Sequence, residues 1–282
     1  MTPRQELDFL SNFIKLSKDE AVKRDFLESF LSYDSFDLLI DADSIVYNVA
    51  HFWLDKELIY SDMIEDFHSQ VRAIALHIEE QGYPVNDIDT FFTTCKNNFR
   101  LELTKDYKGN REVTELSKLV YDLKNVIIDN ISDTIAEDAA HYSDVYEADD
   151  LIPKHIKLFG KGNEIIVSID KDLKQITGCH FDYYKQKTGE IDEWNNPIKV
   201  YKGFTFTSPS EGTELLGRLL LEGDAVDNIK GVKGIGKVKA KKLLKDRSEY
   251  GKFRKVVESY IKEGGDWKEK LTINYHLINL IK

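Results

Sequence analysis

Residues 164–172 read Glu-Ile-Ile-Val-Ser-Ile-Asp-Lys-Asp, a largely apolar run that ends in two aspartates. A short run of this kind predicts a buried β-strand over 164–169. A second run, residues 36–40, ends in the same way at Asp41. Each of these predicted strands therefore has a carboxylate directly after its last residue.

Predicted helices separate the strands along the chain. Apolar residues recur at helical spacing over about 62–81 and 113–138, and a further helix is expected to start at Glu147. Residues 90–94 and 141–145 are two more strand candidates. This alternation predicts an α/β fold with a central, mostly parallel sheet that helices cover on both faces.

Both ends of the chain are predicted to be helical. Residues 3–33 show apolar side chains at helical spacing, which indicates an N-terminal helical extension. A hairpin is expected around Thr188-Gly189-Glu190, and the chain from about Ser208 onward is mostly helical in pattern. The α/β core is therefore expected to carry a separate helical part at its C-terminal side.

The composition is that of a globular protein. The 282 residues are 41% hydrophobic and 11% aromatic, which is enough for one large core or two modest ones. The sequence has neither a long uncharged apolar run nor a secretory signal, so we expect a cytoplasmic protein without a membrane partner. Cys95 and Cys179 lie far apart and lack the spacing of a zinc site, so both are expected to be reduced thiols.

Three acidic groups accompany the predicted strand and helix ends, at 147–150, 170–172 and 224–227. Singly, each could be a helix cap or solvated surface. Together, such dense carboxylates repel one another unless cations lie between them, and Mg²⁺ prefers oxygen ligands. Open parallel sheets bind ligands at the carboxyl ends of their strands. The candidate metal ligands are Asp41, Glu147, Asp149, Asp150, Asp170, Asp172, Asp224 and Asp227.

The positive charge of the chain is concentrated in one segment near its C-terminal end. The net charge is −11, yet residues 230–255 contain eleven Lys or Arg against two acids, a local charge of +9 that leaves −20 for the rest. Glycines allow the backbone to approach a phosphate closely, and lysines neutralise it. The alternative is a solvated basic helix after an ordinary loop. The candidate nucleic-acid-binding residues are Gly231, Lys233, Gly234, Gly236, Lys237, Lys239, Lys241 and Lys242.

A third cluster, residues 107–111, reads Tyr-Lys-Gly-Asn-Arg and follows a predicted strand end. Its Lys108 and Arg111 could hold a scissile phosphate against bound metals and stabilise the charge that develops there. Carboxylates for a divalent metal, combined with cations for a phosphate polymer, indicate a nuclease.

Five segments in this order resemble the structure-specific 5′ nucleases. They are Leu39-Ile40-Asp41, residues 107–111, residues 147–150, Ser168-Ile169-Asp170-Lys171-Asp172, and residues 223–229 with the glycine turn that follows. The likeness is closest to bacteriophage 5′-3′ exonucleases and flap endonucleases, which are related to the 5′ nuclease domain of bacterial DNA polymerase I. It runs from about residue 36 to about residue 250.

The resemblance implies a division of the chain. Residues 36–207 would form a PIN-like 5′ nuclease core, with a helical arch region over about 104–138. Residues 208–282 would form a helical DNA-binding subdomain with a helix-three-turn-helix over about 223–247. Residues 1–35 would be an N-terminal helical extension.

The resemblance also implies an enzyme, a 5′-3′ exodeoxyribonuclease and flap endonuclease that uses two Mg²⁺ ions, for which Mn²⁺ can substitute. Asp41, Asp149 and the nearby Glu147 would serve the first ion, and Asp170, Asp172, Asp224 and Asp227 the second, while Asp150 belongs to the phage form of its motif. Lys108 and Arg111 would be catalytic contacts to the scissile phosphate, and the helix-three-turn-helix would grip duplex DNA and hold K⁺. The implied partners are DNA with 5′ ends, flaps or branches and RNA-DNA hybrid primers, bound by a monomer in the host cytoplasm if a phage encodes it.

One departure from the family pattern concerns the strand that ends near Thr93 and Thr94. The family has an Asp there, whereas no acid occurs between Asp89 and Glu102. A water, either threonine or Asp43 could fill the gap. Two alternatives therefore stand beside the nuclease hypothesis: a metal-dependent ribonuclease of the same fold, and a catalytically weakened protein that binds branched DNA.

Overall fold

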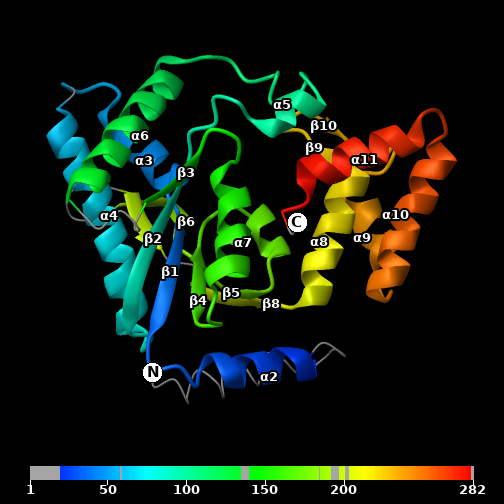
Figure 1. Cartoon of the computed structure of the whole chain (residues 1–282), viewed down its shortest axis with the longest axis horizontal. Helices are drawn as coiled ribbons and strands as arrows, with labels where there is room; N and C mark the ends of the chain where they lie inside the picture. The colour runs from blue at the N-terminus through cyan, green and yellow to red at the C-terminus, as the bar shows by residue number, and fades with distance from the viewer. Residues whose placement is uncertain are drawn as a thin grey trace.

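The computed structural model describes residues 20–57, 59–134, 140–183, 185–191, 197–200 and 203–280. The first part of the predicted N-terminal extension, including Leu10, Phe13 and Ile14, lies outside these residues. The later part forms α2 (Glu20–Phe30), which crosses below the sheet (Figure 1). Phe30 packs there against Phe36 and Phe206, so α2 belongs to the core.

A mostly parallel sheet forms the centre of the protein, as the sequence predicts, and it has six strands. Its spatial order is β3-β2-β1-β4-β5-β8, and every neighbouring pair is parallel except β5 and β8. The strands are β1 (Phe36–Asp41), β2 (Val85–Thr93), β3 (Ala140–Ser143), β4 (Glu164–Val167), β5 (Gly178–Asp182) and β8 (Gly203–Thr207).

The register of the parallel strands brings their carboxyl ends to one edge. Ile40 of β1 lies opposite Thr90 of β2 and Val167 of β4. Asp41, Thr93 and the residues after Val167 therefore meet at the same edge of the sheet, where an open α/β sheet binds its ligand.

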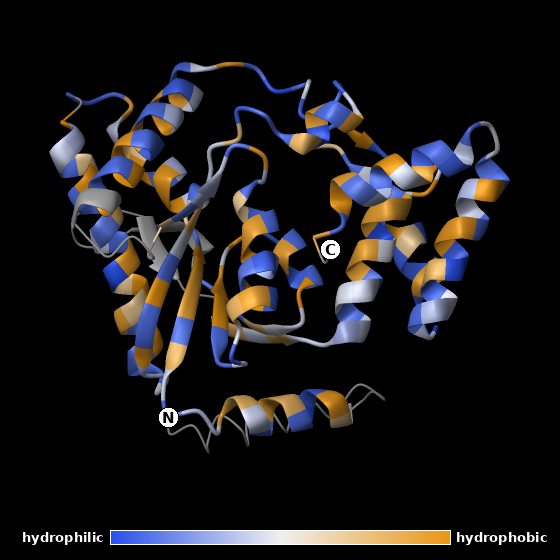
Figure 2. Cartoon of the chain, viewed as in Figure 1, coloured by the Kyte–Doolittle hydropathy of each residue, from blue (hydrophilic) through white to orange (hydrophobic). Residues whose placement is uncertain are grey.

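Helices cover both faces of the sheet. Leu38 and Ile40 pack against α3 (Asp43–Trp53), α4 (Tyr60–Glu80) and α6 (Glu115–Thr134), whereas Leu39 packs with α7 (Ala148–Phe159) on the other face. Figure 1 shows the three helices on one side of the sheet and α7 on the other, and Figure 2 shows apolar residues along the central strands. Because both faces are buried, all six residues of β1 are buried.

The predicted arch region forms two distinct pieces. The short helix α5 (Phe99–Leu103) lies beside the C-terminal helices, and the chain that follows it runs back over the top of the molecule to α6 (Figure 1). Leu119, Leu123 and Ile127 of α6 are buried against the α3–α4 layer. Helix α6 is thus part of the α/β core.

The C-terminal part has a hydrophobic cluster of its own. It contains α8 (Pro209–Glu222), β9 (Gly223–Asp224), β10 (Ile229–Lys230), α9 (Lys237–Leu244), α10 (Glu249–Glu263) and α11 (Trp267–Ile278). Leu220, Ile229, Leu244 and Tyr260 pack together at its centre. Ser208 caps α8, and its hydroxyl accepts a hydrogen bond from the Glu211 amide. This part therefore begins where the helical pattern begins in the sequence.

Two further elements complete the description. The 3₁₀ helix η2 (Asp172–Gln175) follows β4, and β6 (Lys185–Ile191) pairs antiparallel with β7 (Pro197–Val200). The expected hairpin is therefore present, although Thr188–Glu190 lie within β6 and not in its turn. No described helix has the length and apolar character that crossing a membrane requires.

Candidate active site

Asp41 and Asp170 lie together at the carboxyl edge of the sheet. Ser168 joins them, because its hydroxyl donates to Asp41 Oδ2 at 2.8 Å and accepts from the Asp170 amide at 2.9 Å. Burial raises the pKa of Asp41 to about 7, with the negative charges of Asp43 and Asp170 adding to the effect. A cation placed here would relieve that cost.

The start of α7 supplies the next three carboxylates. Glu147 is its N-cap residue and forms a reciprocal capping box with Asp150, which fixes both side chains at the helix end. Burial opposes ionisation of Glu147, but Lys108 and Arg100 outweigh it and lower its pKa. Asp149, between the two, is partly buried, and burial together with Asp150 raises its pKa well above the usual value.

Asp150 is held by a buried arginine. Arg100 donates from its two terminal nitrogens to the two oxygens of Asp150, one of these bonds measuring 2.9 Å, and its Nε donates to the Leu277 carbonyl at 2.9 Å. Arg100 is 1% exposed. This pair links α5, α7 and the end of α11, whereas the role of Asp150 as a metal ligand stays a prediction.

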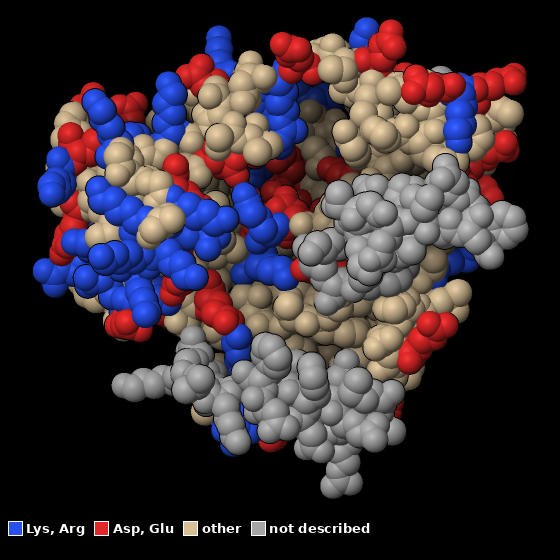
Figure 3. Space-filling model, turned by 180° about the vertical axis from the view of Figure 1, so that it is seen from behind, with Lys and Arg blue, Asp and Glu red and all other residues tan. Residues whose placement is uncertain are grey.

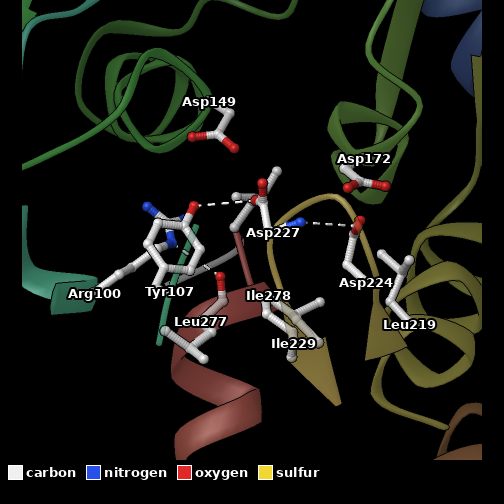
Figure 4. A pocket seen from close by; sticks show the side chains of 11 residues that line it. Arg100, Tyr107, Asp149, Asp172, Leu219, Asp224, Asp227, Ile229, Leu277 and Ile278 are labelled. Carbon is white, nitrogen blue, oxygen red and sulfur yellow. Dashed lines mark hydrogen bonds between the residues drawn. The ribbon is translucent and has the colours of Figure 1, made fainter. Parts of the chain in front are cut away.

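Four carboxylates face one pocket between the core and the C-terminal part. Figure 4 shows Asp149 and Asp172 pointing toward Asp224 and Asp227, which come from β9 and the turn after it. Among the described residues, Asp149 Oδ1 and Asp172 Oδ1 are buried without a hydrogen-bond partner. Burial, with Asp170 and Asp224 nearby, raises the pKa of Asp172 to about 7. Unpartnered carboxylate oxygens of this kind fit a hard divalent cation.

Residues 107–111 place cations on the same pocket. Lys108 Nζ lies 2.7 Å from Glu147 Oε1, and Arg111 lies 2.6 Å from Asp227 Oδ1. The Tyr107 hydroxyl donates to Glu147 at 2.9 Å and lies 3.1 Å from Asp227. The loop is fixed to the β9–β10 turn, because the Lys108 amide donates to the Asp227 carbonyl. The structure thus brings Lys108 and Arg111 to the predicted carboxylates.

The end of β2 shows what stands at the position of the absent aspartate. Thr93 Oγ1 accepts a hydrogen bond from the Ala148 amide at 2.9 Å, so the hydroxyl binds the first residue of α7. Thr94 instead donates to the Ser143 carbonyl. Asp43 accepts from the Thr93 amide at 3.1 Å and pairs with Lys124 of α6 at 2.7 Å. Of the side chains considered for the gap, Asp43 is the carboxylate that lies at this strand end.

Three participants could not be assigned from the sequence. Lys124 enters from α6, which is distant in the chain. Lys171 Nζ lies 3.8 Å from the carboxylates of both Asp172 and Asp224. Its position between Asp170 and Asp172 in the sequence is the signal that could have identified it. Arg100 belongs to a basic group, but only the fold shows that it is buried against Asp150.

The glycine turn follows β10 and leads into α9. A Cβ on Gly231 would lie 2.4 Å from backbone atoms of residues 221–223, and Gly234 has φ +76°, so both positions require glycine. Ala240 and Leu244 bury one face of α9. The other face exposes lysines, and Figure 3 shows Lys and Arg gathered on this side of the molecule beside a hollow with acidic side chains. The exposed residues are Lys233, Lys237, Lys239, Lys241 and Lys242.

Comparisons with known proteins agree with this geometry. A family model described as the 5′-3′ exonuclease N-terminal resolvase-like domain matches residues 37–202. A 5′-3′ exonuclease of Buchnera aphidicola is 30% identical over 80% of this chain and 72% of that protein. DNA polymerase I of Bacillus caldotenax is 31% identical over 85% of this chain, which spans 26% of that polymerase.

A solved structure shares the fold. The bacteriophage T5 flap endonuclease, in a pseudo-enzyme-product complex with DNA and metal ions, superposes with a TM-score of 0.60 at 17% identity, covering 87% of this chain and 89% of that one. At this level of identity the likeness concerns the arrangement of the elements.

Proposed function

The chain belongs to the 5′-3′ exonuclease family, and on this premise we propose that it hydrolyses DNA phosphodiester bonds near 5′ ends, as an exonuclease and flap endonuclease. The observation that carries the proposal is the pocket where Asp149, Asp172, Asp224 and Asp227 face one another. Two of these carboxylates have buried oxygens that no described protein group satisfies.

The carboxylates would hold two divalent cations. Asp41 and Asp149, with Glu147 nearby, would serve the first site, and Asp170, Asp172, Asp224 and Asp227 the second. Mg²⁺ suits these all-oxygen ligands, and Mn²⁺ has similar preferences. Such ions, when bound, activate a water and neutralise charge on the attacking and leaving oxygens.

The protein's own cations would act on the phosphate. Lys108 and Arg111 now contact Glu147 and Asp227, so their charges are already directed at the pocket. A DNA phosphate would compete for both side chains, and their positive charge would stabilise the charge that develops during cleavage. Burial and Glu147 raise the pKa of Tyr107, so its hydroxyl stays protonated and orients Glu147.

The C-terminal part would bind the duplex next to the cut. The exposed lysines of the glycine turn and α9 form a basic surface, and the turn supplies backbone groups for a phosphate. The Gly234 carbonyl accepts from Lys239 at 3.1 Å, which shows that this turn directs an acceptor toward a cation. We extend the proposal to K⁺ binding at this turn, to RNA-DNA hybrid primers as a further substrate, and to a monomer acting in the cytoplasm.

Two features of the end of β2 favour a second candidate, a catalytically weakened protein that binds branched DNA. The end of β2 has Thr93 in place of a carboxylate, and Lys124 adds a positive charge beside Asp43. Both features reduce the negative charge available to the first cation. A ribonuclease of the same fold has no such observation in its favour.

Cleavage of labelled substrates distinguishes these functions. Purified protein would be mixed with 5′-labelled duplex, flap and single-stranded RNA substrates in Mg²⁺, in Mn²⁺ and in a chelator. We expect metal-dependent cutting of duplex and flap DNA. Salt-sensitive binding of branched DNA without turnover would support the weakened protein, and faster cutting of RNA would support the ribonuclease.

A further inference from the structure

A second group of metal-binding side chains lies away from the carboxylate pocket. Asp89, His141 and His155 form the one set of three or more described His, Cys, Asp or Glu residues whose possible ligand atoms all lie within 4.8 Å of one another. The three residues come from β2, β3 and α7. We propose that they bind a transition-metal ion of the zinc class, which fastens the edge strand β3 and helix α7 to the sheet.

The fold directs the three side chains to one point. His141 lies opposite Phe91 in the β2–β3 register, and Asp89 precedes Phe91 by two residues. The side chains of Asp89, Phe91 and His141 therefore lie on the same face of the sheet. Helix α7 covers that face and supplies His155. His141 Nε2 lies 2.6 Å from Asp89 Oδ1, and His155 Nε2 lies 3.8 Å from Asp89 Oδ2.

These distances are close to those of a metal site. Ligands bound at about 2.0–2.2 Å in a tetrahedron lie roughly 3.5 Å apart. The two nitrogen-to-oxygen distances at Asp89, 2.6 and 3.8 Å, lie on either side of that value. Side-chain movements of about 1 Å would therefore bring all three ligand atoms to one ion. Two imidazoles and one carboxylate leave a fourth position for water, a ligand set that zinc enzymes use.

The surroundings leave the three side chains accessible to an ion and hold the two histidine rings in place. The side chains are 12% (Asp89), 18% (His155) and 29% (His141) exposed, so an ion can enter yet is shielded. Phe91 stacks on His141 at 4.7 Å and Phe159 packs on His155 at 5.2 Å, which orients both rings.

This site is separate from the carboxylate pocket. His155 lies eight residues along α7 from Glu147, about 12 Å at the rise of a helix. Asp89 lies four residues before Thr93, about 13 Å along the strand. The ion would therefore stabilise the helix that presents Glu147, Asp149 and Asp150 without taking part in cleavage.

Zinc binding in the presence of Mg²⁺ tests the proposal. Millimolar Mg²⁺ would occupy the carboxylate pocket and compete poorly for imidazole nitrogens. Zn²⁺ would be titrated by competition with a chromophoric chelator, and the melting temperature would be followed with Zn²⁺ and with chelator. We expect one Zn²⁺ per chain, a higher melting temperature in Zn²⁺, and loss of affinity of at least about 10-fold in H141Q and in H155Q.

Three variants provide the controls. H51Q alters an exposed histidine of α3 and should bind Zn²⁺ as the wild type does. D170N alters the carboxylate pocket and should also bind normally. Melting of H155Q in chelator checks that this variant folds, and H141Q gives a second, independent variant. Unchanged affinity in folded H155Q and H141Q, or loss of the Zn²⁺ in D170N, would overturn the proposal.

Discussion

Lys124 reaches from α6 and places its ammonium 2.7 Å from the Asp43 carboxylate, at the end of β2 where Thr93 stands. The same ammonium donates to the Thr93 carbonyl at 2.9 Å, and the Thr93 amide donates to Asp43. The lysine is buried, with 11% of its side chain exposed. A basic residue therefore occupies the strand end beside the proposed first cation site.

Replacing Lys124 by methionine should strengthen cation binding. The change removes a positive charge beside Asp43, whose own charge acts on Asp41, while keeping an unbranched side chain against the core. We expect the Mg²⁺ concentration for half-maximal cleavage to fall about 3- to 10-fold, equivalent to ~1 kcal/mol. The control K118M alters an exposed lysine of the same helix and should leave the Mg²⁺ requirement unchanged. A higher requirement in K124M would show that Lys124 supports the site through its bond to Thr93.

Asp170→Asn should abolish cleavage while DNA binding is retained. Asp170 accepts from the Asp172 amide at 2.8 Å and adjoins Asp41 through Ser168, so it lies between the two proposed cation sites. Asparagine keeps the shape and removes the charge. Turnover should fall by at least about 100-fold, as for loss of one strong electrostatic contact. Near-normal turnover of D170N on a flap substrate would remove Asp170 from the metal ligands.

Lys239→Glu should weaken DNA binding while metal binding is unaffected. Lys239 is exposed on α9, and glutamate replaces a phosphate-neutralising charge by a repelling one. We expect a weaker affinity for duplex DNA and a shallower dependence of that affinity on salt, measured by anisotropy. K268E, on α11, gives a matched charge reversal outside the glycine turn. Equal weakening in both variants would indicate a general effect of net charge.

The metal-free protein should lose stability as the pH rises from about 4 to about 7. Asp41 and Asp172 have pKa values raised to about 7 in the folded chain, against 3.8 in their unperturbed form. The folded chain therefore binds more protons than the unfolded chain in this window, and the contribution of each group, up to ~4 kcal/mol, is lost as the pH passes the folded value.

Thermal unfolding with chelator and with Mg²⁺ measures this effect. D172N should reduce the loss of stability between pH 5 and pH 8, whereas D122N, at an exposed position of α6, should not. Mg²⁺ should raise the melting temperature more at pH 8 than at pH 5, because protons compete with it at low pH. The same melting temperature with and without Mg²⁺ at pH 8 would contradict a cation site here.

The sequence could predict the strand ends because strands leave a strong local pattern. Apolar runs before Asp41 and Asp170 defined β1 and β4, and the alternation with helices predicted the parallel sheet. Helix α3 was not predicted, because its apolar residues follow β1 almost directly. The packing of α6 into the core was also missed, since helical spacing alone does not say which surface a helix covers.

Contacts between distant segments account for what the sequence could not reveal. Lys124 and Thr93 are 31 residues apart, and Arg100 and Asp150 are 50 apart. A single sequence shows residue types and local spacing, whereas contacts between residues this far apart depend on the folded arrangement. Asp41, Asp170 and Glu147 stood out in the sequence because they follow a predicted strand or begin a predicted helix, whereas Asp224 lies in β9 and Asp227 in the turn after it.

The buried pair of Arg100 and Asp150 should be essential for the fold near the pocket. R100M would leave Asp150 as a buried charge without its partner, and we expect a loss of about 3–5 kcal/mol in unfolding free energy. D150N would leave Arg100 unpaired except for Glu147, which lies 3.5 Å away, with a similar cost. The double variant R100M/D150N should be more stable than the sum of the two losses predicts, because no unpaired charge remains. Urea unfolding of the four proteins measures this coupling, with R254M, an exposed arginine of α10, as the control. Additive losses would mean that Arg100 acts through its packing and its bond to the Leu277 carbonyl, and that Asp150 is free to serve a cation.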